Sequence, residues 1–147
     1  MKANNEFRLT IDSRSVNESF ARVAVSAFVA QLDPTIDELG DIKTAVSEAV
    51  TNCIVHAYPE SVGKIYIWTG IFDDGKVKIR IKDRGCGIID IRQAMEPLFS
   101  TLGGERAGLG FAVMESFTDK IKVYSKVGKG TTVCLEKTIT GRPGAND

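Results

Sequence analysis

Three polar residues, Glu48, Asn52 and His56, are spaced four apart in a stretch that otherwise has the apolar periodicity of a packed helix. At roughly 100° of rotation per residue they lie on one helical face, each a single turn from the next. A carboxylate one turn before an amide suits a general base beside a magnesium ligand, because Mg²⁺ prefers hard oxygen ligands. The alternative is a partly solvated helix with scattered polar residues, and on this helix alone both interpretations stay open.

Two glycine motifs further along the chain could hold a ligand. Asp83-x-Gly85-x-Gly87 follows a predicted strand, where a buried carboxylate can accept a hydrogen bond from an exocyclic amine and glycines let the backbone approach a ligand closely. Gly108-x-Gly110 stands at the predicted start of a helix, where free N–H groups and the helix dipole favour phosphate.

A third motif, Gly128-x-Gly130-Thr131, precedes a strand and could bring a hydroxyl beside Asp83. Each motif taken singly also fits an ordinary turn or helix entry. None is a Walker A loop or a dinucleotide fingerprint. Their occurrence together, in this order and after the Glu48–Asn52 pair, argues against a set of unrelated turns.

The elements that must position these residues follow from periodicity and turn signals. Helices are predicted from the capping-box patterns Ser15–Glu18 and Thr35–Glu38, ending near residues 32 and 57. Strands are predicted at 7–12, 64–72, 77–82, about 121–123 and 131–138, a helix at 108–117, and a long connection at 96–107. This order predicts an α+β two-layer sandwich, with a mixed, mostly antiparallel sheet and the helices on one face.

One predicted strand alternates apolar residues with Lys78, Arg80 and Lys82. Alternation of this kind is typical of a strand with one solvated face. It therefore explains the basic residues as solvent-facing, without a binding patch.

The length and charge of the chain bound its class. The 147 residues fit one domain, expected at 1–139, with a disordered tail at 140–147. Lys plus Arg and Asp plus Glu are both 19, so a general nucleic-acid binder, which needs a basic excess, is not expected.

The apolar stretches and cysteines bear on location. The most apolar early stretch, residues 23–29, is far shorter than the roughly 20 residues that span a bilayer, and the N-terminus shows no signal peptide. The three cysteines are far apart and lack metal-site spacing, so a reducing, cytoplasmic location is expected. No attachment to a membrane is expected.

As a set, the motifs resemble the N, G1 and G2 boxes and the last glycine–threonine motif of the GHKL ATPase/kinase superfamily, whose domain is the Bergerat fold. The matching motifs are Glu48-x-x-x-Asn52, Asp83-x-Gly85-x-Gly87, Gly108-Leu-Gly110 and Gly128-x-Gly130-Thr131. More closely, residues 17–22, 47–52 and 97–108 are similar to the sporulation anti-sigma F factor family, serine kinases of endospore-forming bacteria.

The resemblance implies ATP and Mg²⁺ as cofactors and a role for each matching residue. Asn52 would be the Mg²⁺ ligand, and Glu48 would orient or deprotonate the attacking hydroxyl. Asp83 would read the adenine amine with help from Thr131, and Gly85 and Gly87 would lie against the nucleotide.

The remaining site residues would act on the phosphates. Gly108 and Gly110 would cradle them beneath a lid at 97–107, in which Arg106 would neutralise charge on the transferred phosphoryl group. Arg106 could equally be an exposed loop residue. His56 could approach the phosphates or have a capping or structural role.

The only histidine is His56, within the predicted magnesium-binding helix, which excludes autophosphorylation on a separate dimerisation helix. Gyrase- and MutL-type proteins need further domains that 147 residues cannot hold. A compact kinase acting on a separate protein fits best. The alternatives are a nucleotide-gated binding module that sequesters a transcription factor without phosphoryl transfer, and an ATPase fragment of a larger assembly.

The resemblance also implies partners. The family forms a homodimer through its N-terminal strand and helix, binds a sigma factor across that dimer, and phosphorylates a serine of an anti-anti-sigma protein. Glu18 and Arg22 would form part of the sigma-binding surface. Alternatively, Glu18 closes a capping box or forms a solvated i, i+4 pair with Arg22.

Overall fold

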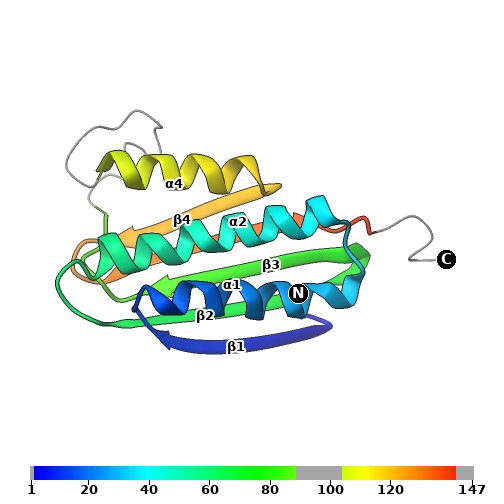
Figure 1. Cartoon of the computed structure of the whole chain (residues 1–147), viewed down its shortest axis with the longest axis horizontal. Helices are drawn as coiled ribbons and strands as arrows, with labels where there is room; N and C mark the ends of the chain where they lie inside the picture. The colour runs from blue at the N-terminus through cyan, green and yellow to red at the C-terminus, as the bar shows by residue number, and fades with distance from the viewer. Residues whose placement is uncertain (1, 89–103, 142–147) are drawn as a thin grey trace.

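A five-stranded sheet carries the fold of this computed structural model, which describes residues 2–88 and 104–141 (Figure 1). The strand order is β1-β2-β3-β5-β4, and all four pairings are antiparallel, so the sheet is antiparallel where a mixed one was expected. The strands are β1 (Asn5–Asp12), β2 (Lys64–Ile71), β3 (Lys76–Asp83), β4 (Lys120–Lys126) and β5 (Gly130–Thr138).

Three α-helices cover one face of this sheet, with α2 packed against both α1 and α4. In Figure 1, α1 and α2 lie in front of the sheet and run roughly along its strands. The helices are α1 (Val16–Val29), α2 (Ile36–Asn52) and α4 (Gly104–Ser116), with short turns η1 (Ala30–Leu32), η2 (Cys53–Ala57) and η3 (Asp73–Gly75). The core lies between the layers, where buried residues of α2 such as Val46 and Val50 join Ile67, Ile81 and Leu135 of the strands. The α+β two-layer prediction is confirmed.

The two predicted capping boxes have different outcomes. At α2 the Thr35 hydroxyl accepts from the Glu38 backbone N–H at 3.0 Å, and the Glu38 carboxylate accepts from the Thr35 N–H at 2.9 Å. At α1 the helix begins at Val16, where the pattern predicted it, but the Ser15 side chain makes no capping hydrogen bond, so the capping box itself does not form. The reason is tertiary, because the Glu18 carboxylate accepts instead from the Ser47 hydroxyl of α2.

The helix expected to run to residue 57 changes form after Asn52. Cys53–Ala57 is a π-helical turn, and the Tyr58 N–H donates to the Cys53 carbonyl five residues back at 3.3 Å. A π turn holds more residues than an α turn and is frequent at functional sites. His56 lies in this wider turn, so the α-helical spacing that aligned it with Glu48 and Asn52 does not extend to it.

The last helix begins earlier than predicted. α4 starts at Gly104, so Gly108 and Gly110 lie inside it and not at its first residue. The N–H groups without intrahelical partners therefore lie in the first turn of α4, before Gly108. The rest of the predicted lid, residues 97–103, lies outside the described residues.

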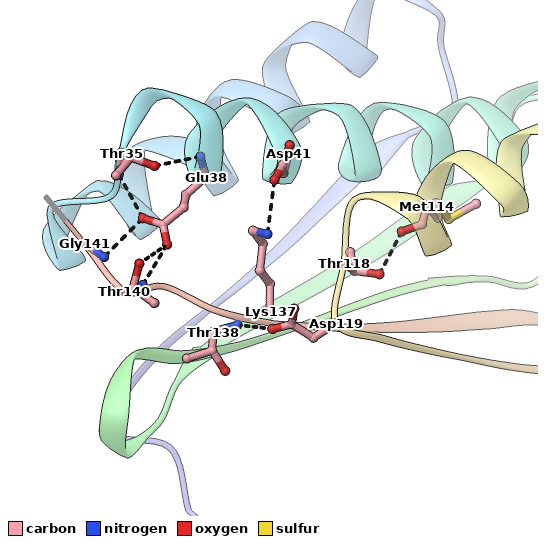
Figure 2. Close-up of polar contacts among 10 residues, drawn as sticks. All are labelled: Thr35, Glu38, Asp41, Met114, Thr118, Asp119, Lys137, Thr138, Thr140 and Gly141. Carbon is pink, nitrogen blue, oxygen red and sulfur yellow. Dashed lines mark hydrogen bonds and ion pairs between the residues drawn. The ribbon is translucent and has the colours of Figure 1, made fainter.

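The end of the described chain folds back onto α2 (Figure 2). The N–H and hydroxyl of Thr140 donate to Glu38 Oε2 at 2.7 and 2.9 Å, and the Gly141 N–H donates to Oε1 at 3.1 Å. Thr140 and Gly141, where the sequence analysis placed the start of a disordered tail, are thus hydrogen-bonded to Glu38, while residues 142–147 lie outside the described part. Within that part, every helix is too short or too polar to span a bilayer.

Candidate functional site

The polar face of α2 lies against α4 at a glycine. A Cβ atom built on Gly110 would stand 3.1 Å from Asn52 Oδ1 and 3.3 Å from Glu48 Oε2. These separations are tighter than most real side-chain contacts, so the helices reach this distance because residue 110 has no side chain. The structure thus brings together Glu48, Asn52 and Gly110, which the sequence placed in one site from motifs about sixty residues apart.

The Asn52 amide at this contact lacks hydrogen-bond partners among the described residues. Its Oδ1 and Nδ2 are both buried. A buried amide without partners is destabilising by about 1–3 kcal/mol, so such a group is usually kept for a ligand. Its oxygen has the hard character that Mg²⁺ prefers.

The surroundings of Asn52 say what else a cation there would need. Within residues 2–88 and 104–141, no cluster of three or more His, Cys, Asp or Glu side chains could hold a metal. A Mg²⁺ ion at the Asn52 oxygen would therefore take most of its ligands from phosphate oxygens and water, which is how Mg²⁺ binds in phosphoryl-transfer sites. The donor set fits a nucleotide-bound Mg²⁺ and does not fit an all-protein metal site.

The second half of the site is the buried Asp83 carboxylate at the end of β3, which is 4 % exposed. Its Oδ1 accepts from the backbone N–H groups of Gly85 at 2.9 Å and Thr131 at 3.1 Å, and its Oδ2 accepts from the Cys53 thiol at 3.5 Å. Burial raises the pKa of Asp83, and these three hydrogen bonds oppose the rise only in part. Oδ2 thus holds only a weak thiol donor among the described residues and can accept a stronger one.

Cys53 is a site residue that the sequence analysis did not single out. It is buried, and its thiol donates to Asp83. Burial, followed by the neighbouring Asp83 carboxylate, raises the pKa of this thiol well above its usual value. The thiol therefore stays protonated and remains a donor to Asp83, a role that no sequence spacing indicates.

The glycines around Asp83 let three backbone segments meet. A Cβ on Gly85 would collide with the Ala57 carbonyl, and one on Gly130, whose φ is +111°, would collide with the Asp83 carbonyl. The Cys86 N–H donates to that Ala57 carbonyl at 3.1 Å. The loop after β3, including Gly87, is therefore pressed between the end of η2 and the β4–β5 turn, with Asp83 at the junction.

Thr131 contacts Asp83 through its backbone. Its N–H bonds the carboxylate, while its hydroxyl pairs with Ser125 Oγ at 2.7 Å. The hydroxyl that the sequence analysis expected beside Asp83 is therefore engaged with Ser125. Ser125, which the sequence did not single out, also accepts from the Ile88 N–H at 2.8 Å and so holds the loop after β3 to β4.

The remaining predicted residues lie on η2 and α4. His56 lies in η2, where its carbonyl accepts from the Cys86 thiol at 3.2 Å. Gly108 and Arg106 lie in α4, in the turns whose side chains fall outside the described set.

The predicted partner residues lie on α1. Arg22 Nη1 stands 3.9 Å from Glu18 Oε1, so the i, i+4 pair is present. Glu18 also accepts from Ser47, the residue that precedes Glu48 on α2. The outer side of α1 exposes three large apolar side chains, Val16, Phe20 and Val23.

Comparisons with known proteins agree with this geometry. The sequence model of the histidine kinase-like ATPase domain matches residues 10–137. An anti-sigma F factor of Caldanaerobacter subterraneus subsp. tengcongensis is 56 % identical over 140 residues, covering 95 % of this chain and 97 % of that protein. An anti-sigma F factor of Geobacillus kaustophilus is 54 % identical over 136 residues, covering 92 % of this chain and 93 % of that protein.

Solved structures share the fold at low identity. The RsbU and RsbW domains of a Mycobacterium tuberculosis protein match with a TM-score of 0.68 and 21 % identity, over 92 % of this chain and 33 % of that chain. The mycobacterial sensor histidine kinase MprB matches with a TM-score of 0.57 and 16 % identity, over 92 % of this chain and 100 % of that chain. On its motifs, fold and relatives, the chain belongs to the histidine kinase-like ATPase domain family and, within it, to the anti-sigma F factors.

Proposed function

We propose that this chain is an ATP-dependent protein-serine kinase that also binds and inhibits a sigma factor, and that its phosphoryl acceptor is a serine of an anti-anti-sigma protein. The observation that carries the proposal is the contact of Glu48 and the unsatisfied Asn52 amide with Gly110. The names of the relatives, anti-sigma F factors at 54–56 % identity, support the choice of partner.

The base of the nucleotide would be read at Asp83. With Oδ1 fixed by two backbone donors, Oδ2 can accept from the exocyclic amine of adenine. A guanine offers a carbonyl at that place, so the carboxylate would repel it. The buried carboxylate thus supports selection of ATP over GTP.

The phosphates would lie between α2 and α4. Asn52 Oδ1 would hold Mg²⁺, and the bound ion would neutralise charge on the β- and γ-phosphates. Glu48, one turn before Asn52, would accept the proton of the serine hydroxyl as it attacks the γ-phosphorus, and the ADP oxygen would leave with the bonding electron pair. Arg106 remains a prediction for charge neutralisation from the lid.

The protein partners would use α1. Glu18 and Arg22 present a carboxylate and a guanidinium beside the exposed Phe20, and this mixture of charged and apolar groups is typical of interface surfaces. We infer that a homodimer forms through this N-terminal region and that the sigma factor binds across it.

The decisive test is transfer of label from γ-labelled ATP to a purified anti-anti-sigma protein, with the phosphosite mapped by mass spectrometry. We expect Glu48→Gln to lower the transfer rate by about 100-fold or more while Mg·ATP still binds. Glu115→Gln, which removes an exposed carboxylate of α4, is the matched control and should leave transfer unchanged.

Other results would contradict the proposal in distinguishable ways. Transfer by Glu48→Gln at the wild-type rate would remove the base role. Tight Mg·ATP binding without transfer to any protein would instead make the chain a nucleotide-gated binding module. Absence of any heat of Mg·ATP binding would remove the site itself.

A further inference from the structure

The face of the sheet opposite the helices carries a concentration of positive charge. Every outward position of β3 is basic, and so is every outward position of β4 except Tyr124. The only carboxylate projecting from this side of β3, β4 and β5, all fully described, is Glu136. The chain as a whole is neutral, with 19 basic and 19 acidic residues. The excess of basic residues on this face therefore reflects an uneven distribution of charge over the surface. The outward basic residues are Lys76, Lys78, Arg80, Lys82, Lys120, Lys122 and Lys126.

Strand register arranges these side chains in rows across the sheet. Trp68 of β2 pairs with Arg80 of β3, Arg80 pairs with Cys134 of β5, and Cys134 pairs with Lys122 of β4. Around this row lies an open hollow of about 370 Å³, with Phe72 and Tyr124 among its lining residues. The face is therefore a hollow with aromatic walls and basic surroundings.

Two cations of the hollow are held over aromatic rings. The Arg80 guanidinium lies 4.8 Å from the Trp68 ring centre, and Lys78 Nζ lies 4.9 Å from that of Phe72. Stacking of this kind restricts a long side chain in advance, so less entropy is lost when it pairs with an anion. The indole N–H of Trp68 is also buried without an acceptor among the described residues. Both observations favour an acceptor-rich anionic ligand.

The chain already contains an example of the anion that fits. The Glu136 carboxylate lies 4.0 Å from Lys76 Nζ and 3.8 Å from Lys78 Nζ on this same face. Nucleic acid is disfavoured because the Trp68 and Phe72 faces that bases would stack on are occupied by cations. A second copy is disfavoured because two basic faces repel.

We propose that this basic sheet face, defined as the outward side of β3, β4 and β5 with Trp68, binds an acidic segment of a partner protein. Glu or Asp side chains of that segment would pair with Arg80 and Lys122, and an apolar side chain would enter the hollow between Trp68 and Tyr124. The face lies opposite α2 and α4, so this contact is separate from the proposed nucleotide site.

The single tryptophan makes the test direct, because Trp68 fluorescence reports on the hollow alone. The intact chain is titrated with a short labelled peptide of alternating glutamate and serine around a central phenylalanine. Its glutamine counterpart is the control, and peptide anisotropy is the second readout. We expect the glutamate peptide to bind and to change Trp68 emission. Its affinity should fall as the salt concentration rises.

Charge-reversal variants locate the binding. Two variants, Lys122→Glu on the exposed edge strand β4 and Arg80→Glu, should each lower the affinity for the peptide by about tenfold. Lys43→Glu, which changes an exposed lysine of α2, should leave the affinity unchanged. Thermal melts and Mg·ATP binding of each variant show whether the fold and the nucleotide site remain. Because Lys122 is exposed, its variant keeps the test valid if Arg80→Glu fails to fold.

Three results would overturn the proposal. The first is equal binding of the glutamine peptide, and the second is equal weakening by Lys43→Glu. The third is tighter binding of oligothymidine or of phosphatidylserine vesicles than of the peptide, which would make the face a nucleic-acid or membrane surface.

Discussion

At the scale of single residues, the site depends on polar groups held in an apolar setting. Asp83 is buried at a strand end, and two backbone N–H groups and a thiol fix its oxygens. Asn52 is buried with no such partners among the described residues. The Asp83 carboxylate is thus held in a fixed orientation that can bind one edge of a ligand, whereas the Asn52 amide keeps its hydrogen-bonding capacity for a ligand.

Asp83→Asn should separate ligand binding from folding. The amide oxygen can still accept from the Gly85 and Thr131 N–H groups, so the fold should persist, while Mg·ATP binding should fall by at least about tenfold. Calorimetry with Mg·ATP and a thermal melt measure the two effects. Asp83→Ala is the contrasting variant, expected to lose stability because it leaves both N–H groups buried without an acceptor.

The raised pKa of Asp83 sets the sign of its pH dependence. A carboxyl whose pKa is higher in the folded than in the unfolded chain lowers the free energy of unfolding as pH rises from the unfolded value, 3.8, through the folded one. Asp83→Asn should therefore gain stability relative to wild type above that window. A constant difference in stability at all pH values would contradict this account.

At the scale of elements, the closeness of α2 and α4 depends on one glycine. Gly110→Ala places a methyl group 3.1–3.3 Å from Asn52 and Glu48, while alanine itself favours a helix by about 0.5–1 kcal/mol. We expect little change in melting temperature and a clear loss of phosphoryl transfer.

Gly40→Ala in α2 is the matched control, since a Cβ there meets nothing within 4 Å. It should raise stability by about 0.5–1 kcal/mol and leave transfer unchanged. Equal activity of the Gly110 and Gly40 variants would show that the α2–α4 spacing does not position Glu48 and Asn52.

The start of α2 joins two distant segments through Glu38 (Figure 2). Partial burial would raise the pKa of Glu38, but hydrogen bonds from Thr35, Thr140 and Gly141 outweigh it and lower the pKa from 4.5 to about 2. Because the folded pKa is depressed, the stabilisation is complete above pH 4.5 and is lost as pH falls towards 2.

Glu38→Gln should therefore melt lower than wild type at neutral pH, and the difference should shrink between pH 4.5 and about 2. Asp37→Asn, which removes an exposed carboxylate in the same turn, should not reproduce this change. Thermal melts across the pH series decide it. A difference that persists at pH 2 would rule out the carboxylate hydrogen bonds as its source.

At the scale of the whole molecule, three surfaces are separate. The α2–α4 contact holds the candidate site, the outer side of α1 exposes an apolar stripe, and the open side of the sheet is basic. Val16, Phe20 and Val23 are 75 %, 52 % and 56 % exposed, which is unusual for large apolar groups on one helix of a small domain. An exposed apolar stripe of this kind suits the interface of the proposed dimer.

Phe20→Glu should shift the chain from dimer to monomer, because it puts a charge into the proposed apolar interface. Val127→Glu changes an equally exposed apolar residue, 59 % exposed on the β4–β5 turn, and should leave the mass unchanged. Light scattering coupled to size exclusion measures both. A dimeric Phe20→Glu variant would place the interface elsewhere.

The sequence by itself predicted most of the helices and strands and grouped the motifs of the proposed site. Periodicity and capping patterns act locally, so the strands and the Thr35 cap were predictable, and the Asp83 and Glu48–Asn52 motifs were identifiable as one set. Only the tertiary structure decided that Glu18 bonds Ser47, that Cys53 donates to Asp83, and that α2 ends in a π turn. It also decided that the lysines of β3 share a face with those of β4. These features arise from contacts between segments that are distant in the sequence, and the local sequence of one segment does not specify which other segment packs against it.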